Sequence, residues 1–419
     1  MNMPASPGQN LAFIPSADSE TGGMHSPARE RLWPAAGAIL TIDLGAIRAN
    51  WRWLRDRVAP AACGAVLKAD AYGLGAALVG PALLAEGCRD FFVAHLEEGI
   101  ALRQDLRGQP GAEEARLHVM HGLFDGTERE ALAHGLIPVL NSLEQVAGWA
   151  GLSRAEGRRL PAWLQLDTGM ARFGFSVGEL DRLLEDGRDL AAVEPIRVMS
   201  HLACADEPGH PANAAQLGAF NAMRRRLPHL PTSLAASSGI FLDRAWHGGL
   251  VRPGVALHGV APLPRGENPL RPVLRLDARV VQTRSVPAGT AVGYGHSFTT
   301  RTPSRLATIA VGYADGFLRS ASNRGRAMWE GMPMPILGRV SMDSIVLDAS
   351  ALPENALRPG DTVELIGPDH DLEAVAEAAG TIPYEILTSL GQRYHRRYET
   401  GAPGSSGEVL QPTGPAVTA

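Results

Sequence analysis

Gly64-Ala65-Val66-Leu67-Lys68 is a short apolar run that ends in a polar side chain, and it is the first of eight such runs along the chain. The other seven are Phe91–His95, Leu117–His121, Ile137–Leu140, Ala162–Asp167, Ile196–His201, Ser233–Ser237 and Val251–His258. Segments with helical spacing of apolar residues separate them, and strands that alternate with helices favour parallel pairing. Eight such units over about 220 residues predict an α/β fold, a (β/α)₈ TIM-like barrel. A doubly wound sheet is the alternative, but no run is followed by a full Gly-x-Gly-x-x-Gly motif.

The pattern changes after about residue 274, where apolar and polar residues alternate and turn residues become frequent. This alternation predicts a mainly β C-terminal domain with one late helix near 372–379. Its expected strands lie at 277–284, 307–311, 335–340, 344–347 and 362–366. We therefore divide the chain into a disordered extension (1–38), the barrel (39–274), which opens with a short strand at 39–44, the β domain (275–399) and a flexible tail (400–419).

Composition narrows the class of protein. The 419 residues carry a net charge of −5, which offers no overall electrostatic attraction for nucleic acid or an anionic membrane. The sequence has no long apolar run, and its N-terminal residues lack the features of a signal peptide. The three cysteines, at positions 63, 88 and 204, suit a reducing compartment. We expect a cytoplasmic protein.

Lys68 is the only lysine in the chain, because the other 38 of the 39 basic residues are arginine. Arginine can replace lysine as a solvated cation, but its guanidinium does not deprotonate and cannot act as an amine nucleophile. A retained lysine therefore suggests a covalent role. The alternative explanation is a composition biased toward arginine.

Other polar residues are expected at the same end of the barrel as Lys68. His201 ends the sixth run, Ser237 ends the seventh, Arg252 and Gly254 lie in the eighth, and Arg172 follows the fifth. Barrel enzymes carry their chemistry at the C-terminal ends of the strands and often bind phosphate after the last two. A lysine amine beside a phosphate site suggests pyridoxal 5′-phosphate, whose aldehyde condenses with lysine.

The segment AVLKADAYGLG (65–75) closely resembles the pyridoxal-phosphate lysine motif of the alanine racemases. The resemblance spans about residues 39–398 and continues through DTGMARFGF (167–175), SHLACADEP (200–208), VRPGVALHG (251–259), GYGHSF (293–298), VGYADGF (311–317) and GRVSMD (338–343). It implies an isomerase with a pyridoxal-phosphate barrel of fold type III. It also implies a homodimer with shared active sites.

The resemblance implies a two-base mechanism that interconverts L-alanine and D-alanine. Lys68 would hold the cofactor and serve as the base for the D-enantiomer, and Tyr294 would be the base for the L-enantiomer. His201 and Arg172 would favour the Tyr294 phenolate, since a nearby cation lowers the pKa of an acid. Arg252 would face the pyridine nitrogen without protonating it, which weakens the ring as an electron sink and suppresses transamination.

The remaining binding roles also follow from the resemblance. The phosphate would be bound by the hydroxyls of Ser237 and Tyr72 and by the backbone N–H groups of Gly254 and Val255. The substrate carboxylate would be bound by Arg172 and the backbone N–H of Met342. Tyr294, Tyr313 and Met342 would come from the β domain of a partner subunit.

The sequence departs from the family pattern at three places. Gln165 stands where many members have a carbamylated lysine that positions the arginine, so a neutral amide must do this. Gly391 stands at the apparent position of another phosphate-binding tyrosine. His258 replaces the more common tyrosine, and the sequence offers no physical account of that change.

Several alternatives remain open at this stage. A serine or broad-specificity racemase is compatible with the motifs. The fold-related decarboxylases use a cysteine in the β domain, whereas all three cysteines here precede residue 205. A cofactor-carrying barrel without enzymatic activity would leave about 125 residues unexplained, and a plain interaction module is the remaining alternative.

His118 and His121 lack a metal-binding pattern, so no metal is expected. The product would serve peptidoglycan through D-alanine biosynthesis, or the enzyme would recover L-alanine.

Overall fold

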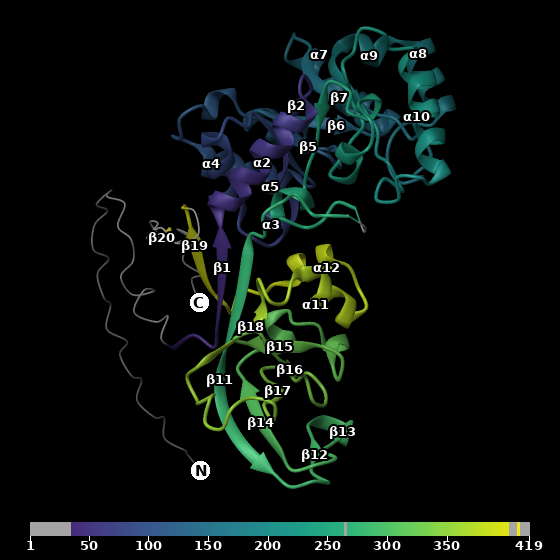
Figure 1. Ribbon diagram of the computed structural model, residues 1–419. Helices are drawn as coiled ribbons and strands as arrows, with labels where there is room; N and C mark the ends of the chain where they lie inside the picture. The colour runs from purple at the N-terminus through teal and green to yellow at the C-terminus, as the bar shows by residue number, and fades with distance from the viewer. Residues whose placement is uncertain (1–34, 264–265, 402–408, 411–419) are drawn as a thin grey trace, which may run out of the picture.

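The computed structural model describes residues 35–263, 266–401 and 409–410. It consists of a barrel formed by the first half of the chain and an elongated β-rich part formed by the second half (Figure 1). The predicted fold class, a (β/α)₈ barrel followed by a mainly β domain, is confirmed. The segments expected to be disordered, 1–38 and 400–419, lie mostly outside the described residues. Within the described ranges, no helix combines the length and the apolar character needed to cross a membrane.

All eight apolar runs contribute strands to the barrel. The strands β3 to β9 pair in parallel and in chain order, and β10 pairs in parallel with β2. The barrel closes where the Gly64 N–H donates to the Val251 carbonyl (3.0 Å) and the Arg252 N–H donates to the Ala235 carbonyl (3.0 Å). The barrel strands are β2 (Ala62–Cys63), β3 (Ala65–Val66), β4 (Asp90–Val93), β5 (Arg116–Val119), β6 (Leu136–Leu140), β7 (Leu160–Gln165), β8 (Val193–Met199), β9 (Thr232–Ser233) and β10 (Leu250–Val251).

Helices connect the barrel strands and lie on the outside of the barrel (Figure 1). Several begin at a side chain that accepts a backbone N–H, as at Asp43, Ser142 and Ser176, which explains why the sequence starts a helix there. The helical segments are α2 (Leu44–Val58), α3 (Lys68–Tyr72), α4 (Ala76–Ala85), α5 (Leu96–Leu106), α6 (Glu128–Ala133), α7 (Leu143–Ala155), α8 (Val177–Asp186), α9 (Arg188–Ala192) and α10 (Pro211–Arg224).

The second part of the molecule is built on the long strand β11, which pairs with β1, β14 and β18. Its elements are β1 (Ala38–Asp43), β11 (Leu274–Val286), β12 (Ala291–Val292), β13 (Phe298–Thr299), β14 (Ser304–Ile309), β15 (Arg326–Trp329), β16 (Met332–Pro335), β17 (Ile345–Asp348), β18 (Thr362–Ile366), α11 (Leu372–Ala379), α12 (Pro383–Ser389), β19 (His395–Glu399) and β20 (Val409–Leu410). Strand β1 therefore connects the two parts, since it belongs to this sheet although the sequence placed it with the barrel.

Two expectations about the second part were wrong. The strand expected at 335–340 ends at Pro335, because Gly338 has a positive φ of 77° that interrupts extended backbone. The sequence predicted one late helix, and α11 is that helix, but α12 follows it directly. The second helix matters for function because it packs against the barrel next to Lys68.

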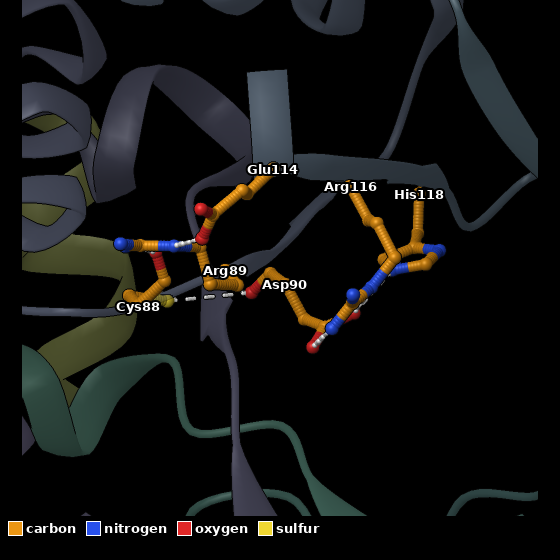
Figure 2. A network of polar contacts seen from close by, with 6 residues as sticks. All are labelled: Cys88, Arg89, Asp90, Glu114, Arg116 and His118. Carbon is orange, nitrogen blue, oxygen red and sulfur yellow. Dashed lines mark hydrogen bonds and ion pairs between the residues drawn. The ribbon is translucent and has the colours of Figure 1, made fainter. Parts of the chain in front are cut away.

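An ion pair between the exposed side chain of Arg116 and the buried carboxylate of Asp90 lies at the N-terminal ends of strands β5 and β4 (Figure 2). Arg116 Nε and Nη2 donate to the Asp90 carboxylate at 2.8 and 2.6 Å, and His118 Nε2 lies 3.0 Å from the same group. The His118 ring stacks on Phe92 with 4.6 Å between ring centroids. His118 is therefore a core residue, and this cluster stabilises the end of the barrel opposite the strand ends that carry Lys68.

Candidate active site

Lys68 lies directly after the first barrel strand, at the C-terminal mouth of the barrel, where the sequence predicted it. Its side chain is partly buried, and its pKa is lowered, first by removal from water and then by the positive charge of Arg172, while the carboxylate of Glu98 opposes the shift. A lower pKa increases the fraction of neutral amine near neutral pH, which is the nucleophilic form.

The chain after Lys68 turns in the left-handed sense. Residues Ala69 to Tyr72 all have φ between 53° and 57°, although none of them is glycine. Left-handed backbone costs about 1–2 kcal/mol per residue with a Cβ, so contacts elsewhere must hold this turn. Two come from β19 of the second part, where Arg396 Nη1 donates to the Gly73 carbonyl (2.7 Å) and the Tyr398 hydroxyl donates to the Leu74 carbonyl (2.9 Å).

The left-handed turn brings Tyr72 next to Gly254, which begins the segment after strand β10. A Cβ at Gly254 would lie 2.8 Å from Tyr72 Cζ and closer still to the hydroxyl, so only glycine leaves room there. The N–H groups of Gly254 and Ala256 both donate to Ser237 Oγ, at 3.0 and 3.2 Å. Three of the four groups predicted to bind phosphate, Ser237, Tyr72 and Gly254, therefore lie together, and the fourth, the Val255 N–H, lies in the chain between the two N–H groups that donate to Ser237.

The sequence analysis missed Tyr384, which α12 places at this same position. Its ring centroid lies 6.3 Å from that of Tyr72, and its hydroxyl interacts with Ser238. Helix α12 packs closely on the turn, since a Cβ at Gly73 would lie 2.5 Å from the Leu387 carbonyl oxygen. Although Gly391 carries no phenol, Tyr384 places one beside Tyr72.

His258 packs behind Tyr72, with 5.0 Å between the ring centroids. It is fully buried, and neither ring nitrogen has a hydrogen-bond partner in the described structure. Burial lowers its pKa to about 3, so the ring is neutral. His258 thus acts as an apolar spacer behind Tyr72, which accounts for an aromatic ring at this position but not for the choice of histidine.

Arg252 lies inside the barrel, 2% exposed. Its guanidinium donates to the Ser200 carbonyl (2.8 Å) and to the Ser233 hydroxyl, and it forms no ion pair with a carboxylate in the described part of the chain. Burial and the charge of Arg197 lower its pKa to about 9, which still leaves it a cation at neutral pH. A buried cation held by neutral acceptors can donate a hydrogen bond to a ligand and keep its own proton.

His201 follows β8 and faces the same space. Removal from water, together with the charges of Arg252, Arg172 and Lys68, lowers its pKa to about 3. The imidazole is therefore neutral, which leaves Arg172 as the charged one of the two groups expected to favour the Tyr294 phenolate. The largest cause of the lowered pKa is removal from water, and the neighbouring positive charges add to it.

Arg172 belongs to the loop that follows β7. Asp167 organises this loop by accepting the N–H groups of Gly169, Met170 and Ala171 on one carboxylate oxygen, at 2.9 to 3.1 Å. The Arg172 guanidinium is exposed, lies over the Phe173 ring (5.5 Å) and has no ion-pair partner among the described residues. An unpaired guanidinium at the mouth of the barrel is suited to bind a carboxylate.

Gln165 is buried beneath this loop. Its Nε2 donates to the Phe173 carbonyl at 3.5 Å. Phe173 is the neighbour of Arg172 in the chain, and Gln165 makes no hydrogen bond to the Arg172 guanidinium among the described contacts. The amide thus supports the backbone of the loop, and it does so more weakly than a direct contact with the arginine would.

Tyr294, Tyr313 and Met342 lie in the second part of the molecule and are 70%, 41% and 52% exposed. Tyr313 and Met342 are held side by side, since the Tyr313 N–H donates to the Ser341 carbonyl (3.0 Å) and the Ala314 N–H donates to the Met342 carbonyl (3.0 Å). Strands β12 and β13, which flank Tyr294, lie at the end of the molecule remote from α3 (Figure 1). Within one chain, therefore, Tyr294 does not reach Lys68.

The fold and the site define a two-domain enzyme class, in which a barrel mouth carries one lysine amine, two arginines without a carboxylate partner among the described residues and a cluster of hydroxyl and N–H donors. Comparison with known families identifies the class. Residues 42–262 match the alanine racemase N-terminal domain, and residues 273–398 match the alanine racemase C-terminal domain. The chain belongs to the alanine racemase family.

Individual relatives agree with this assignment. The chain is 52% identical to a catabolic alanine racemase of Agrobacterium fabrum over 371 residues, which is 88% of this chain and 94% of the relative. It is 51% identical to an alanine racemase of Brucella canis over 377 residues, covering 87% and 94%. Among solved structures, the alanine racemase of Bartonella henselae with covalently bound pyridoxal phosphate has a TM-score of 0.83 and 44% identity, covering 87% of this chain and 99% of that one.

Proposed function

We propose that this protein is a pyridoxal-phosphate-dependent alanine racemase that interconverts L-alanine and D-alanine. The observation that carries the proposal is the convergence of the only lysine, the donors around Ser237 and the buried Arg252 on one barrel mouth, within a chain of this family.

The residues fit the cofactor. Gly254 leaves room for the Tyr72 ring, and beside it lie the hydroxyls of Ser237, Tyr72 and Tyr384 and the N–H groups of Gly254, Val255 and Ala256. Hydroxyl and N–H donors of this kind suit a phosphate. Lys68 would hold the aldehyde end, and Arg252 would donate to the ring nitrogen. When bound, pyridoxal phosphate withdraws electrons from the substrate Cα and so makes its proton acidic.

We propose that two bases act on opposite faces of the substrate. Lys68 Nζ would accept the α-proton from the D-enantiomer and return it in the reverse direction, since its depressed pKa favours the neutral amine. Tyr294 Oη would do the same for the L-enantiomer. Arg172 and the Met342 N–H would hold the carboxylate, which fixes the substrate so that each base meets only one face. Tyr313 would form the wall of the pocket beside Met342.

The active site would be shared between two copies of the chain. Tyr294, Tyr313 and Met342 are exposed and remote from Lys68 in the same chain. A homodimer in which the β domain of one copy covers the barrel mouth of the other would supply the missing base. In this arrangement, Arg172 of one copy and Met342 of the other would bind one carboxylate.

We also propose the following organisation and location. Residues 39–274 without strand β1 form the cofactor-binding barrel, and residues 275–399 form the β domain. The enzyme works in the cytoplasm, because the three thiols at positions 63, 88 and 204 are all free and suit a reducing compartment.

The lysine is tested by borohydride reduction of the purified protein, followed by peptide mapping. The cofactor should be found on the peptide that contains Lys68. The Lys68→Arg variant should bind no cofactor covalently and should lose turnover with L-alanine. A label elsewhere, or full activity in the variant, would remove Lys68 from the mechanism. Release of carbon dioxide in place of enantiomer exchange would assign the chain to the decarboxylases, and faster turnover of L-serine would reassign the substrate.

The shared site is tested by co-expression of Lys68→Arg and Tyr294→Phe chains with two different tags. Each parent should be nearly inactive by itself. Mixed dimers isolated through both tags contain one site with both wild-type bases, so we expect about half of the wild-type turnover per dimer. If Lys68 and Tyr294 of the same chain formed the site, the mixed dimers would be as inactive as the parents.

A further inference from the structure

Glu98 makes contacts that the proposed mechanism does not use. It is the third residue of α5, and its Oε2 accepts the N–H groups of Ala94 (2.7 Å) and His95 (3.1 Å), as in a capping box. Its other oxygen, Oε1, accepts the N–H of Ala69 at 2.7 Å, across 29 residues of sequence. A capping box needs only one oxygen, so the second contact requires another explanation.

The residue that Glu98 holds is the first of the left-handed turn, directly after Lys68. The strained backbone of Ala69 to Tyr72 determines how Lys68 and Tyr72 are placed relative to each other. Later parts of the turn have their own anchors, since the Ala76 N–H donates to Asp70 Oδ1 (2.7 Å) and Arg396 holds the Gly73 carbonyl. The start of the turn is anchored by Glu98.

The charges around Lys68 make the carboxylate of Glu98 significant. Arg172 approaches the amine from the loop after β7, and the neutral rings of His121 and His201 face it from the ends of β5 and β8. Glu98, from α5, is the negative group that acts on the amine against Arg172. The negative charge of Glu98 favours the ammonium form of Lys68. It therefore limits how far burial and Arg172 lower the pKa of the amine.

We propose that Glu98 is a positioning residue for Lys68, which fixes the start of the left-handed turn through Ala69 and supplies the negative charge that faces the amine among the cations of the barrel mouth. This inference rests on the proposed role of Lys68. It predicts that Glu98 sets the protonation of the amine as well as the shape of the turn.

The test measures the protonation of Lys68 directly, which is feasible because the chain has no other lysine. The full-length protein, stripped of cofactor, is labelled with trace acetic anhydride over a range of pH. Acetylation of the Lys68 peptide is then quantified by mass spectrometry, with the α-amino group as an internal standard. The variants are Glu98→Gln, which removes the charge and keeps one acceptor oxygen in place of the two that serve Ala69 and the capping box, and Glu98→Asp, which keeps the charge. Glu97→Gln is the control, since Glu97 is exposed in the same first turn of α5.

Removal of the negative charge should lower the pKa of the amine and raise its neutral fraction. On the acid side of the midpoint, we expect the acetylation rate of Glu98→Gln to rise about threefold to tenfold, with the midpoint of the pH profile moved to lower pH. Glu97→Gln should match the wild type, and Glu98→Asp should lie close to it. A purely structural role would change the rate equally at every pH and leave the midpoint in place.

An unchanged midpoint in Glu98→Gln would overturn the inference. If Glu98→Gln does not fold, the Glu98→Asp profile decides. Aspartate keeps the negative charge, so a midpoint for Glu98→Asp well below that of the wild type would contradict a charge effect. Failure of the proposed function is distinguished by the borohydride experiment. Cofactor found on Lys68 together with an unchanged midpoint refutes only the role of Glu98, whereas cofactor found elsewhere refutes the assignment of Lys68.

Discussion

Replacement of Gly254 by alanine tests the geometry of the phosphate end most directly. The added methyl would lie 2.8 Å from Tyr72 Cζ and closer to the hydroxyl, whereas carbon atoms prefer about 3.5–4.0 Å. The ring must therefore move by roughly 0.7 Å or more. Behind it stand His258 and Tyr384, with ring centroids 5.0 and 6.3 Å away, so there is little room to retreat.

The cost has two parts. Overpacking in a close-packed interior typically destabilises a protein by about 1–3 kcal/mol. A displaced Tyr72 hydroxyl would also lose its hydrogen bond to a charged phosphate, which is worth about 1.5–3 kcal/mol. Since 1.4 kcal/mol corresponds to a factor of ten in affinity, Gly254→Ala should raise the dissociation constant for pyridoxal phosphate at least about tenfold.

The assay is a titration of the cofactor-stripped, full-length protein with pyridoxal phosphate, followed by absorbance, with thermal unfolding measured in parallel. Gly218→Ala is the matched control, because a Cβ at Gly218, inside α10, meets no atom within 4 Å. That variant should bind the cofactor normally and gain about 0.5–1 kcal/mol of stability. An affinity of Gly254→Ala within twofold of the wild type would refute the assignment of the Tyr72 hydroxyl to the phosphate.

Three further predictions concern other parts of the molecule. His258 has a folded pKa of about 3 against an ordinary 6.5, so the unfolded chain binds more protons between these values and stability is lost as the pH falls from 6.5 toward 3. His258→Phe should make this loss shallower by at most about 1.4 kcal/mol per pH unit, as measured by urea unfolding at several pH values; equal slopes would contradict it. Asp90→Asn should cost about 1–3 kcal/mol in the same assay, because the exposed Arg116 and the buried His118 lose a charged acceptor, while the affinity for cofactor should stay unchanged. Tyr384→Phe should weaken pyridoxal phosphate about tenfold, since it removes one hydroxyl from the phosphate end; unchanged affinity would exclude Tyr384 from binding.

Local sequence determined the elements of this protein well. Alternation of short apolar runs with helical segments is a local property, and all eight runs became barrel strands. The expected helix at 372–379 and the strand at 362–366 have the predicted bounds. The strand expected at 335–340 failed because a positive φ at Gly338 depends on what surrounds it and not on its apolar neighbours.

The sequence predicted only some of the residues of the candidate site. Lys68, Ser237, Arg252 and His201 follow strands, and parallel strands carry their C-terminal ends to one mouth, so the sequence could place them together. Tyr384 could not be found this way, because it comes from α12, 316 residues after Lys68 in the chain, and joins the site by helix packing. The sequence Ile382-Pro383-Tyr384, with proline at the start of a helix, was the available signal.

The sequence by itself determined the barrel, the β domain and the single lysine amine at position 68. Hydrophobic periodicity and residue chemistry are local properties that can be read directly from the order of the residues. Tertiary structure alone decided the left-handed turn after Lys68, the neutral state of His201, the sheet to which β1 belongs and the separation of Tyr294 from Lys68. Backbone strain, desolvation and distance depend on groups far apart in the chain. Such properties take their values only when folding brings those groups into contact.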